Sequence, residues 1–120
     1  MAESVKKTFA TPDEVRTFDK GRVDLVHLDS QTVGMATFEP GWRWSECVKP
    51  IVGTDSCQAH HVGYALSGRL TVRMNDGTEF DAEPGTVYEI QPGHDAWVVG
   101  DDHFVGLEFQ SRTAAEYAKK

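Results

Sequence analysis

The chain has 120 residues, enough for one hydrophobic core, and its 39% hydrophobic and 26% charged residues are typical of a globular domain rather than a disordered chain. The 19 acidic residues outnumber the 12 basic ones, and the lysines and arginines are scattered, so the sequence offers no positive stripe for nucleic acid. No segment approaches the ~20 apolar residues of a membrane helix or the apolar core of a signal peptide, so we expect one cytoplasmic domain with no membrane partner.

The N-terminal part is predicted to begin with a short helix and to continue as strands. Thr11 can cap a helix, Pro12 suits the first helical position, and Glu14 lies three residues after Thr11, as in a capping box. Farther along the chain the helical period disappears. Residues 23–28 and 32–38 form short alternating runs instead, which predict strands.

Most of the remaining elements are also predicted to be strands. Trp42 and Trp44 share one face of a strand with a period of two, and residues 47–59 are too broken by turn formers for regular structure. Residues 61–74 alternate, and Asn75-Asp76-Gly77 indicates a tight hairpin after them. So many short strands predict an all-β sandwich or barrel. Further strands are predicted at residues 78–81, 86–90, 96–99 and 104–109, and a short C-terminal helix at residues 111–120.

Two segments resemble the sequence motifs of the cupin superfamily. The first is residues 61–70, HVGYALSGRL, and the second is Gly85 followed by residues 91–94, QPGH. The resemblance, to a small single-domain cupin, covers residues 34–109. It implies one domain over residues 1–120 with a cupin-type double-stranded β-helix, or jelly-roll barrel, whose core spans about residues 22–110 between the short terminal helices. In this family three histidines and a glutamate from the two motifs usually hold a divalent metal.

The first motif implies three candidate metal ligands. In the family, two histidines one residue apart precede a glutamate, and a glycine follows seven positions after it. Aligned on Gly68, this pattern places His61 at the glutamate position, with Cys57 and Asp55 at the positions of the paired histidines. Aspartate, cysteine and histidine all bind metals, so the resemblance implies that the chemistry of these positions is kept.

The second motif departs from the family pattern. Its two glycines are present, but the positions of the proline, the histidine and the asparagine hold Gln91, Ala96 and Gly100. His94 lies two residues before Ala96, so strand parity directs both side chains to the same face. We therefore expect His94 to supply the missing imidazole.

The candidate metal ligands are then Asp55, Cys57, His61 and His94, a mixed set of oxygen, sulfur and nitrogen donors. Such a set favours Zn²⁺ or Fe²⁺ over Mg²⁺ or Ca²⁺, and a thiolate favours zinc. In a reducing compartment Cys47 and Cys57 are expected to be free thiols. Structural roles are the alternative for each candidate: a buried apolar thiol at 57, a turn residue at 55, a core histidine at 61 and a turn cap at 94.

Large aromatic side chains on the predicted strands are candidates for the wall of a ligand pocket. They would suit a planar or hydrophobic organic ligand, although filling the core is an equally ordinary role. Tyr64 and Asp95 are the nearest candidates for proton transfer. The aromatic set is Trp42, Trp44, Tyr64, Tyr88 and Trp97.

Three interpretations of function stay open at this point. The first is a metal-dependent enzyme of oxygenase, isomerase or lyase type that acts on a small organic molecule. The second is a non-catalytic module that senses a metabolite or a metal, and the third is a metal-free barrel that uses His61 and His94 as acid and base. Because small jelly-roll barrels commonly pair through edge strands, we also expect a homodimer.

Overall fold

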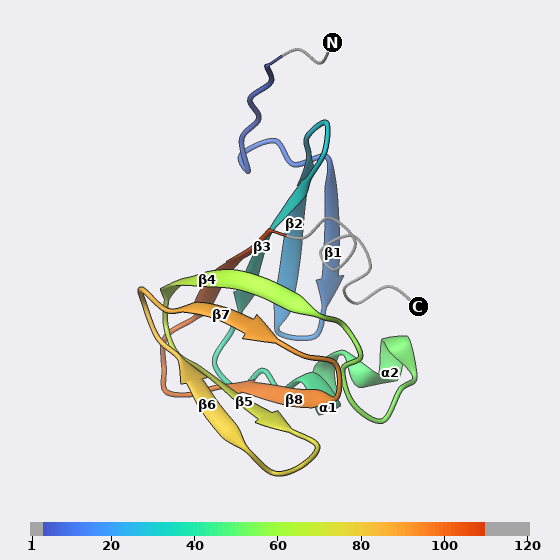
Figure 1. Cartoon of the computed structure of the whole chain (residues 1–120), viewed down its shortest axis with the longest axis vertical. Helices are drawn as coiled ribbons and strands as arrows, with labels where there is room; N and C mark the ends of the chain where they lie inside the picture. Colours follow the sequence, from blue (N-terminus) through green and yellow to red (C-terminus); the bar gives the residue numbers. More distant parts are fainter. Residues whose placement is uncertain (1–3, 110–120) are drawn as a thin grey trace.

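Alternation of buried and more exposed side chains along short strands governs the architecture of this chain. The computed structural model describes residues 4–109. These residues form nine strands and two single-turn helices (Figure 1). In chain order the elements are β1 (Glu14–Phe18), β2 (Gly21–His27), β3 (Thr32–Phe38), α1 (Trp44–Cys47), α2 (Lys49–Val52), β4 (His61–Ser67), β5 (Leu70–Met74), β6 (Glu79–Ala82), β7 (Val87–Ile90), β8 (His94–Val98) and β9 (Phe104–Glu108).

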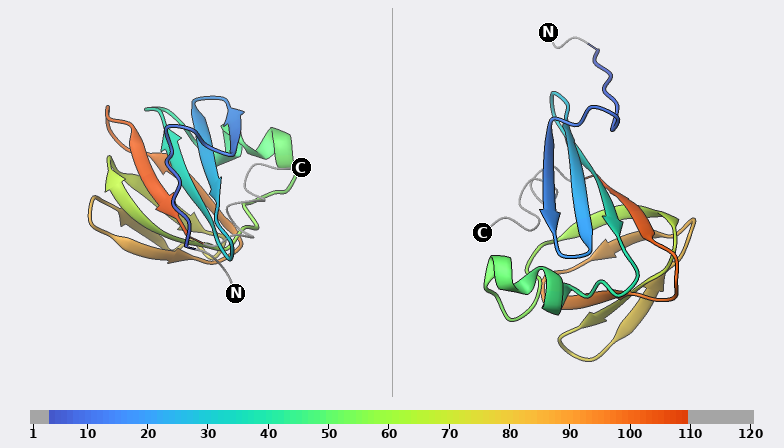
Figure 2. Two further views of the ribbon diagram at one scale, coloured as in Figure 1. Left: turned by 90° about the horizontal axis from the view of Figure 1, so that it is seen from above. Right: turned by 180° about the vertical axis from the view of Figure 1, so that it is seen from behind.

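The strands form two antiparallel sheets that face each other. The larger sheet has the order β1-β2-β3-β9-β4-β7, and the smaller sheet has the order β6-β5-β8. The helices lie to one side, and the β2–β3 turn extends beyond the barrel at one end (Figure 2). The inner faces of both sheets enclose the core, which confirms the expected all-β fold with two packed sheets. No helix within residues 4–109 is long and apolar enough to cross a membrane.

Aromatic side chains from β3, from the segment after it and from β9 pack together in the core. The rings of Phe38 and Trp42 stack with centroids 3.9 Å apart and planes 3° apart, and Phe104 lies 6.1 Å from Phe38. All three side chains are buried. Burial of large apolar side chains of this kind is the main favourable term in folding.

Several elements agree closely with the sequence prediction. Strand β3 has the predicted bounds, 32–38, and the predicted hairpin at residues 75–77 joins β5 to β6. Gly77 adopts a φ of 93°, a conformation that favours glycine, and the Asp76 carboxylate accepts hydrogen bonds from the backbone and hydroxyl of Thr78.

Other elements differ from the prediction. The predicted N-terminal helix is wrong: Glu14–Phe18 forms β1, which pairs with β2 along its whole length. The Asp13 carboxylate, within the expected capping segment, accepts a hydrogen bond from the backbone N–H of His27 in β2. Tertiary pairing therefore outweighs the local capping signal. The predicted C-terminal helix at residues 111–120 lies outside the described residues.

The segment from residue 42 to residue 59 is also more helical than predicted. Trp44 begins α1 instead of continuing a strand, and α2 lies within the predicted loop. Strand β8 begins at His94, two residues earlier than predicted, so His94 belongs to a strand of the smaller sheet.

Candidate metal centre

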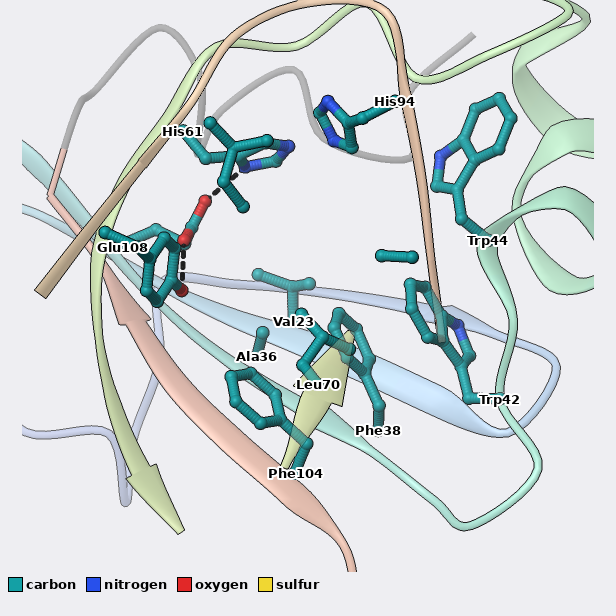
Figure 3. Close-up of a pocket in the computed structure, with 13 residues that line it drawn as sticks. Val23, Ala36, Phe38, Trp42, Trp44, His61, Leu70, His94, Phe104 and Glu108 are labelled. Atoms are coloured by element: carbon teal, nitrogen blue, oxygen red, sulfur yellow. Dashed lines mark hydrogen bonds and ion pairs between the residues drawn. The ribbon is translucent and has the colours of Figure 1, made fainter. Parts of the chain in front are cut away.

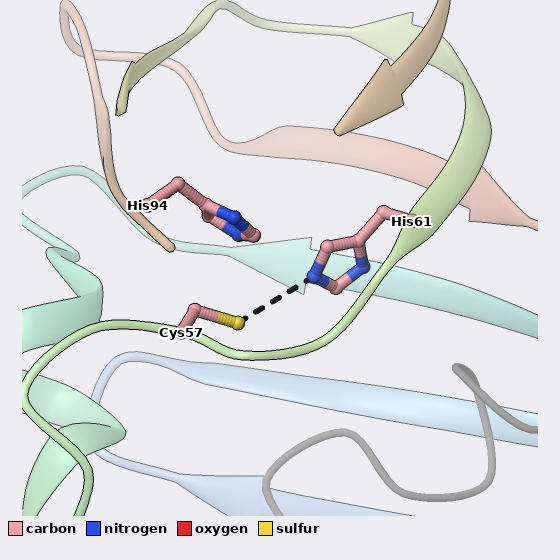
Figure 4. Close-up of side chains that lie close together, drawn as sticks. All are labelled: Cys57, His61 and His94. Atoms are coloured by element: carbon pink, nitrogen blue, oxygen red, sulfur yellow. Dashed lines mark hydrogen bonds between the residues drawn. The ribbon is translucent and has the colours of Figure 1, made fainter. Parts of the chain in front are cut away.

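Three buried side chains converge where the two sheets meet. The sulfur of Cys57 and one ring nitrogen each of His61 and His94 lie within 4.8 Å of one another (Figure 4). His61 begins β4 in the larger sheet and His94 begins β8 in the smaller sheet, so the cluster joins both sheets. Thiolate and imidazole are the donors that Zn²⁺ and other borderline transition metals prefer.

Backbone hydrogen bonds hold Cys57 beside the start of β8. Cys57 donates its N–H to the carbonyl of His94 at 2.7 Å, and its own carbonyl accepts the N–H of Gly93 at 2.7 Å. These bonds fix an isolated β-bridge between Cys57 and His94. The loop that precedes β4 is therefore attached to the opposite sheet at the residue that supplies the thiol.

The His94 ring is oriented by the turn that leads into β8. Its Nδ1 lies 2.7 Å from the backbone carbonyl of Gln91. A carbonyl only accepts hydrogen bonds, so Nδ1 carries a proton and Nε2 is the nitrogen whose lone pair is available to a metal. Gln91, which departs from the family's proline, thus contributes through its main chain.

The His61 ring is oriented by a buried carboxylate. Its Nδ1 donates to Oε1 of Glu108, and the other carboxylate oxygen accepts a 2.7 Å hydrogen bond from the Tyr88 hydroxyl. The Nε2 atom of His61 then faces the Cys57 sulfur at 3.6 Å. A carboxylate that holds one imidazole nitrogen while the other faces a metal is a common second layer of metal sites.

Strand register and a glycine make this hydrogen-bond chain possible. In neighbouring strands Gly63 pairs with Tyr88 on one side and with Glu108 on the other. A Cβ atom at Gly63 would lie 2.6 Å from the Tyr88 hydroxyl, and one at Gly106 would lie 3.0 Å from it. The phenol therefore reaches Glu108 across positions that carry no side chain.

The electrostatics of the metal-free cluster follow from this geometry. Burial opposes ionisation of the Cys57 thiol, but its interactions with the His61 and His94 rings outweigh this effect and lower the pKa of Cys57 to about 6. Burial likewise disfavours a charged His61, but the Glu108 carboxylate and the Cys57 sulfur outweigh it and raise the pKa of His61 to about 10. Burial and the adjacent Glu108 charge raise the pKa of Tyr88 above its ordinary value, so its hydroxyl stays a donor.

A pocket opens beside the cluster, between the two sheets. The space between atoms there is about 520 Å³, a value that includes open solvent at the mouth of the pocket. His61, His94, Tyr88 and Glu108 lie at one end, and apolar side chains form the rest of the wall (Figure 3). The apolar wall consists of Val23, Ala36, Phe38, Trp42, Trp44, Leu70, Ile90, Ala96 and Phe104.

The structure brings together three of the four expected metal ligands. Cys57, His61 and His94 form the cluster, whereas Asp55 is exposed in the preceding loop and is not part of it. The expectation of Asp55 as a fourth ligand is therefore corrected. The alternation that places residues within a strand does not apply to this loop, because its path is fixed by the bonds at Cys57.

The expected pocket residues divide between the pocket wall and the outer surface. Trp42, Trp44 and Tyr88 line the pocket, whereas Trp97 lies on the outer face of β8 with the Arg43 guanidinium 4.2 Å from its ring centre. The five residues of β8 alternate, with His94 buried at the first position. A residue three positions later therefore faces away from the pocket.

Tyr64 and Asp95, the expected proton-transfer residues, also lie away from the pocket. Tyr64 is three positions after His61 in β4, and Asp95 directly follows His94 in β8, so both lie on outer faces. Asp95 accepts hydrogen bonds from the backbone N–H groups of Ser45 and Ala96. The bond from Ser45 helps to hold α1 against β8. Glu108 and Tyr88 occupy the places nearest to His61 instead.

Glu108 is the site residue that the sequence analysis missed. Its signal is the alternation of β9, in which Phe104, Gly106 and Glu108 share the buried face. A carboxylate on a buried strand face needs a partner, because an unpaired buried charge is costly. That reasoning would have predicted a partner for Glu108 but not its identity.

Comparison with known proteins identifies the fold. No family model matches the sequence, and no curated protein matches it. A sugar phosphate isomerase of a cupin superfamily from Silicibacter pomeroyi is 18% identical with a TM-score of 0.61, covering 88% of this chain and 74% of that one. The Cnp3 cupin domain of Schizosaccharomyces pombe is 14% identical with a TM-score of 0.59 (93% and 77%). An oxalate decarboxylase from Lactobacillus farciminis is 17% identical with a TM-score of 0.60 (82% and 30%). These similarities confirm the expected jelly-roll architecture.

Proposed function

We propose, from the cupin fold that this chain adopts, that it binds one divalent transition metal at the pocket end and a small organic ligand beside it. The metal would be held by Sγ of Cys57 and by Nε2 of His61 and of His94. The observation that carries this proposal is the convergence of three buried donor atoms within 4.8 Å, each from a different segment of the chain. The second nitrogen of each imidazole is already hydrogen-bonded, as metal sites require.

The donor set fits a metal with room for a further ligand. One sulfur and two nitrogens match Zn²⁺ best and also suit Fe²⁺, whereas Mg²⁺ and Ca²⁺ prefer oxygen. Three protein donors leave a coordination position open, and the imidazoles line the pocket. When bound, the metal would supply a Lewis acid that polarises a carbonyl or lowers the pKa of a bound water.

The chain's own residues would prepare this site in three ways. Glu108 holds His61 in the orientation that directs Nε2 toward Cys57. Tyr88 keeps its proton and donates a hydrogen bond to Glu108, which holds the carboxylate in place. The apolar wall would limit the water around a bound ligand, and polar contacts are stronger where water is scarce.

A metal-dependent enzyme is the interpretation that we favour. The polar end of the pocket combines the open side of the cluster with two hydrogen-bonding groups, Tyr88 and Glu108, and this combination supports chemistry on a bound ligand. A non-catalytic sensing module would use the same pocket without turnover. A metal-free acid–base site is favoured by one observation, the contact between Cys57 and His61 with pKa values moved in opposite directions.

Metal content separates these interpretations. The untagged full-length protein is purified, supplied with Zn²⁺, dialysed and analysed by elemental mass spectrometry. We expect about one zinc per chain, lost in His61→Ala and kept in the matched control His60→Ala, whose ring bonds to the Glu89 carboxylate outside the cluster. A folded protein that retains no metal contradicts the proposal and leaves the acid–base interpretation. Turnover of a ligand by the zinc-loaded protein then distinguishes an enzyme from a sensor.

The homodimer and the cytoplasmic location remain predictions. Leu66 and Val87 are exposed apolar residues, 44% and 75% accessible, on strands of the larger sheet. Light scattering at micromolar concentration tests the dimer, for which a monomer mass is the contrary result, and cell fractionation tests the location.

A further inference from the structure

The composition of the pocket wall limits which ligand fits beside the cluster. We infer that the ligand is a small molecule with an apolar, preferably planar body and a single oxygen-bearing head group that meets the Cys57–His61–His94 cluster. This inference rests on the proposed function and deepens it by naming the ligand class. It excludes sugars and ligands with a second charged group away from the metal-binding head, such as sugar phosphates.

The charges that line the pocket limit which ligand groups it can hold. Among the residues that line the pocket in the described part of the chain, none is a lysine or an arginine. The ionisable groups at the polar end are the two imidazoles, the Tyr88 phenol and the Glu108 carboxylate, and they lie around the place where the metal would bind. A phosphate needs charged or closely packed N–H donors to replace its water shell. A phosphate or a second carboxylate placed against this wall would therefore be buried without a partner.

The hydrogen-bonding groups of the pocket wall limit how many polar atoms the ligand can carry. A sugar carries hydroxyl groups around its whole ring, and each hydroxyl that is buried without a partner is costly. The charged and hydroxyl-bearing side chains of this pocket are gathered at one end (Figure 3), and the far wall adds the indole N–H of Trp42, which is buried without a hydrogen-bond partner among the described residues. A ligand can thus satisfy several polar atoms at one end only, with a single acceptor atom able to meet Trp42.

The aromatic rings of the pocket wall limit the shape of the ligand's body. The far part of the pocket is bounded by the aromatic rings of Phe38, Trp42 and Phe104, and Phe38 and Trp42 lie parallel, 3.9 Å apart. Trp44 lies on the same side of the pocket as His94 (Figure 3). Rigid aromatic walls suit a planar or branched apolar body, which gains contact area at little entropic cost. The same fold in a sugar phosphate isomerase does not imply the same substrate, because fold does not determine function.

Two hydroxamates with the same metal-binding head test the inference. Acetohydroxamate carries a methyl group and benzohydroxamate carries a phenyl ring, and both are titrated by calorimetry into the zinc-loaded full-length protein. We expect benzohydroxamate to bind about tenfold more tightly or better, because the ring buries several additional carbon atoms. Fructose 6-phosphate is expected to bind no better than acetohydroxamate. Equal affinity of the two hydroxamates, or tighter binding of the sugar phosphate, overturns the inference while the metal proposal stands.

A pair of variants on one strand locates the apolar body. Ala36 and Thr37 are neighbours in β3, with Ala36 buried in the pocket wall and Thr37 on the outer face. Ala36→Phe is expected to abolish the preference for benzohydroxamate, whereas Thr37→Phe is expected to keep it. If Ala36→Phe does not fold, Phe38→Leu provides a smaller change, which is expected to weaken benzohydroxamate severalfold relative to acetohydroxamate. An unchanged preference in a folded variant contradicts the placement.

If the protein takes up no metal, a second pair of ligands tests the ligand class separately from the metal centre. In that case the metal proposal fails, and benzamide and acetamide are titrated into the metal-free protein in place of the hydroxamates. Tighter binding of benzamide supports the ligand class independently of the metal. Equal affinity, or no binding of either amide, overturns it.

Discussion

Two neighbouring histidines, His60 and His61, each meet a carboxylate on opposite faces of one sheet. His60 contacts Glu89 at 2.8 Å with side chains 32% and 58% exposed, whereas the side chains of His61 and Glu108 are 6% and 11% exposed. Both pairs join a histidine to a glutamate, and His60 and His61 are adjacent in the sequence. Only the buried pair, His61 and Glu108, lies beside further donors, which are a thiol and a second imidazole. The difference shows that the face of the strand, more than the residue type, determines which histidine can serve a site.

Removal of each carboxylate gives the largest expected contrast. Glu108→Ala leaves His61 and Tyr88 without their buried acceptor, so we expect a loss of about 3 kcal/mol in the free energy of unfolding. The exposed counterpart Glu89→Ala is expected to cost less than about 1 kcal/mol. Urea denaturation of both variants measures the difference. Similar losses in the two variants would contradict the distinction between the faces.

A methyl group at Gly63 should disturb the inner chain from the backbone. The Cβ atom of Gly63→Ala would lie 2.3 Å from the Leu107 carbonyl and 2.6 Å from the Tyr88 hydroxyl, so we expect a loss of about 2 kcal/mol. The Gly106→Ala variant, whose nearest contact is 2.9 Å, is expected to lose less. Thermal unfolding compares the two, and the reverse order would show that the phenol does not need the space above Gly63.

The pH dependence of metal binding should report the charges of the inner cluster. A metal binds the thiolate and the neutral imidazole. With the pKa of Cys57 lowered to about 6, the thiol has already lost its proton above that pH, and with the pKa of His61 raised to about 10, the imidazole must still lose one below that pH. Zinc affinity measured by chelator competition should thus rise about tenfold per pH unit between pH 7 and 9. An affinity independent of pH over this range would contradict the charge assignment.

Loss of a single hydroxyl on each face gives the smallest contrast. Tyr88→Phe removes the hydrogen bond to Glu108, so we expect a loss of about 1 kcal/mol in stability and weaker zinc binding, because the carboxylate is less firmly held. Tyr64→Phe, on the outer face of β4, is expected to change stability by less than about 0.5 kcal/mol and to leave zinc binding unchanged. Unfolding and zinc titrations on both variants test this, and unchanged zinc affinity in Tyr88→Phe would remove the phenol from the site.

Local pattern predicted the parts of this molecule that depend on strand parity. Alternation predicted the bounds of β3, the Asn75-Asp76-Gly77 turn predicted the hairpin after β5, and the cupin resemblance together with strand parity predicted that His61 and His94 face a common point with Cys57. Each of these signals lies within a short stretch of sequence.

Other features depend on pairings that local pattern does not contain. Glu108 meets His61 because β9 pairs with β4 in the register that sets Gly63 opposite Glu108. Glu14 lies in a strand because β2 pairs with β1. Both contacts join segments that single-sequence periodicity treats separately.

The proposed metal centre requires the Cys57 sulfur as a ligand, and cobalt spectroscopy measures this directly. Co²⁺ bound by a thiolate gives an intense sulfur-to-metal charge-transfer band, and Cys47, a buried free thiol whose sulfur lies 3.8 Å from the Asp19 carboxylate, provides the matched control. We predict that the cobalt-loaded protein shows the band, that Cys47→Ser keeps it and that Cys57→Ser loses it. A band that persists in Cys57→Ser, or that is absent from the unmodified protein, would contradict the metal centre described here.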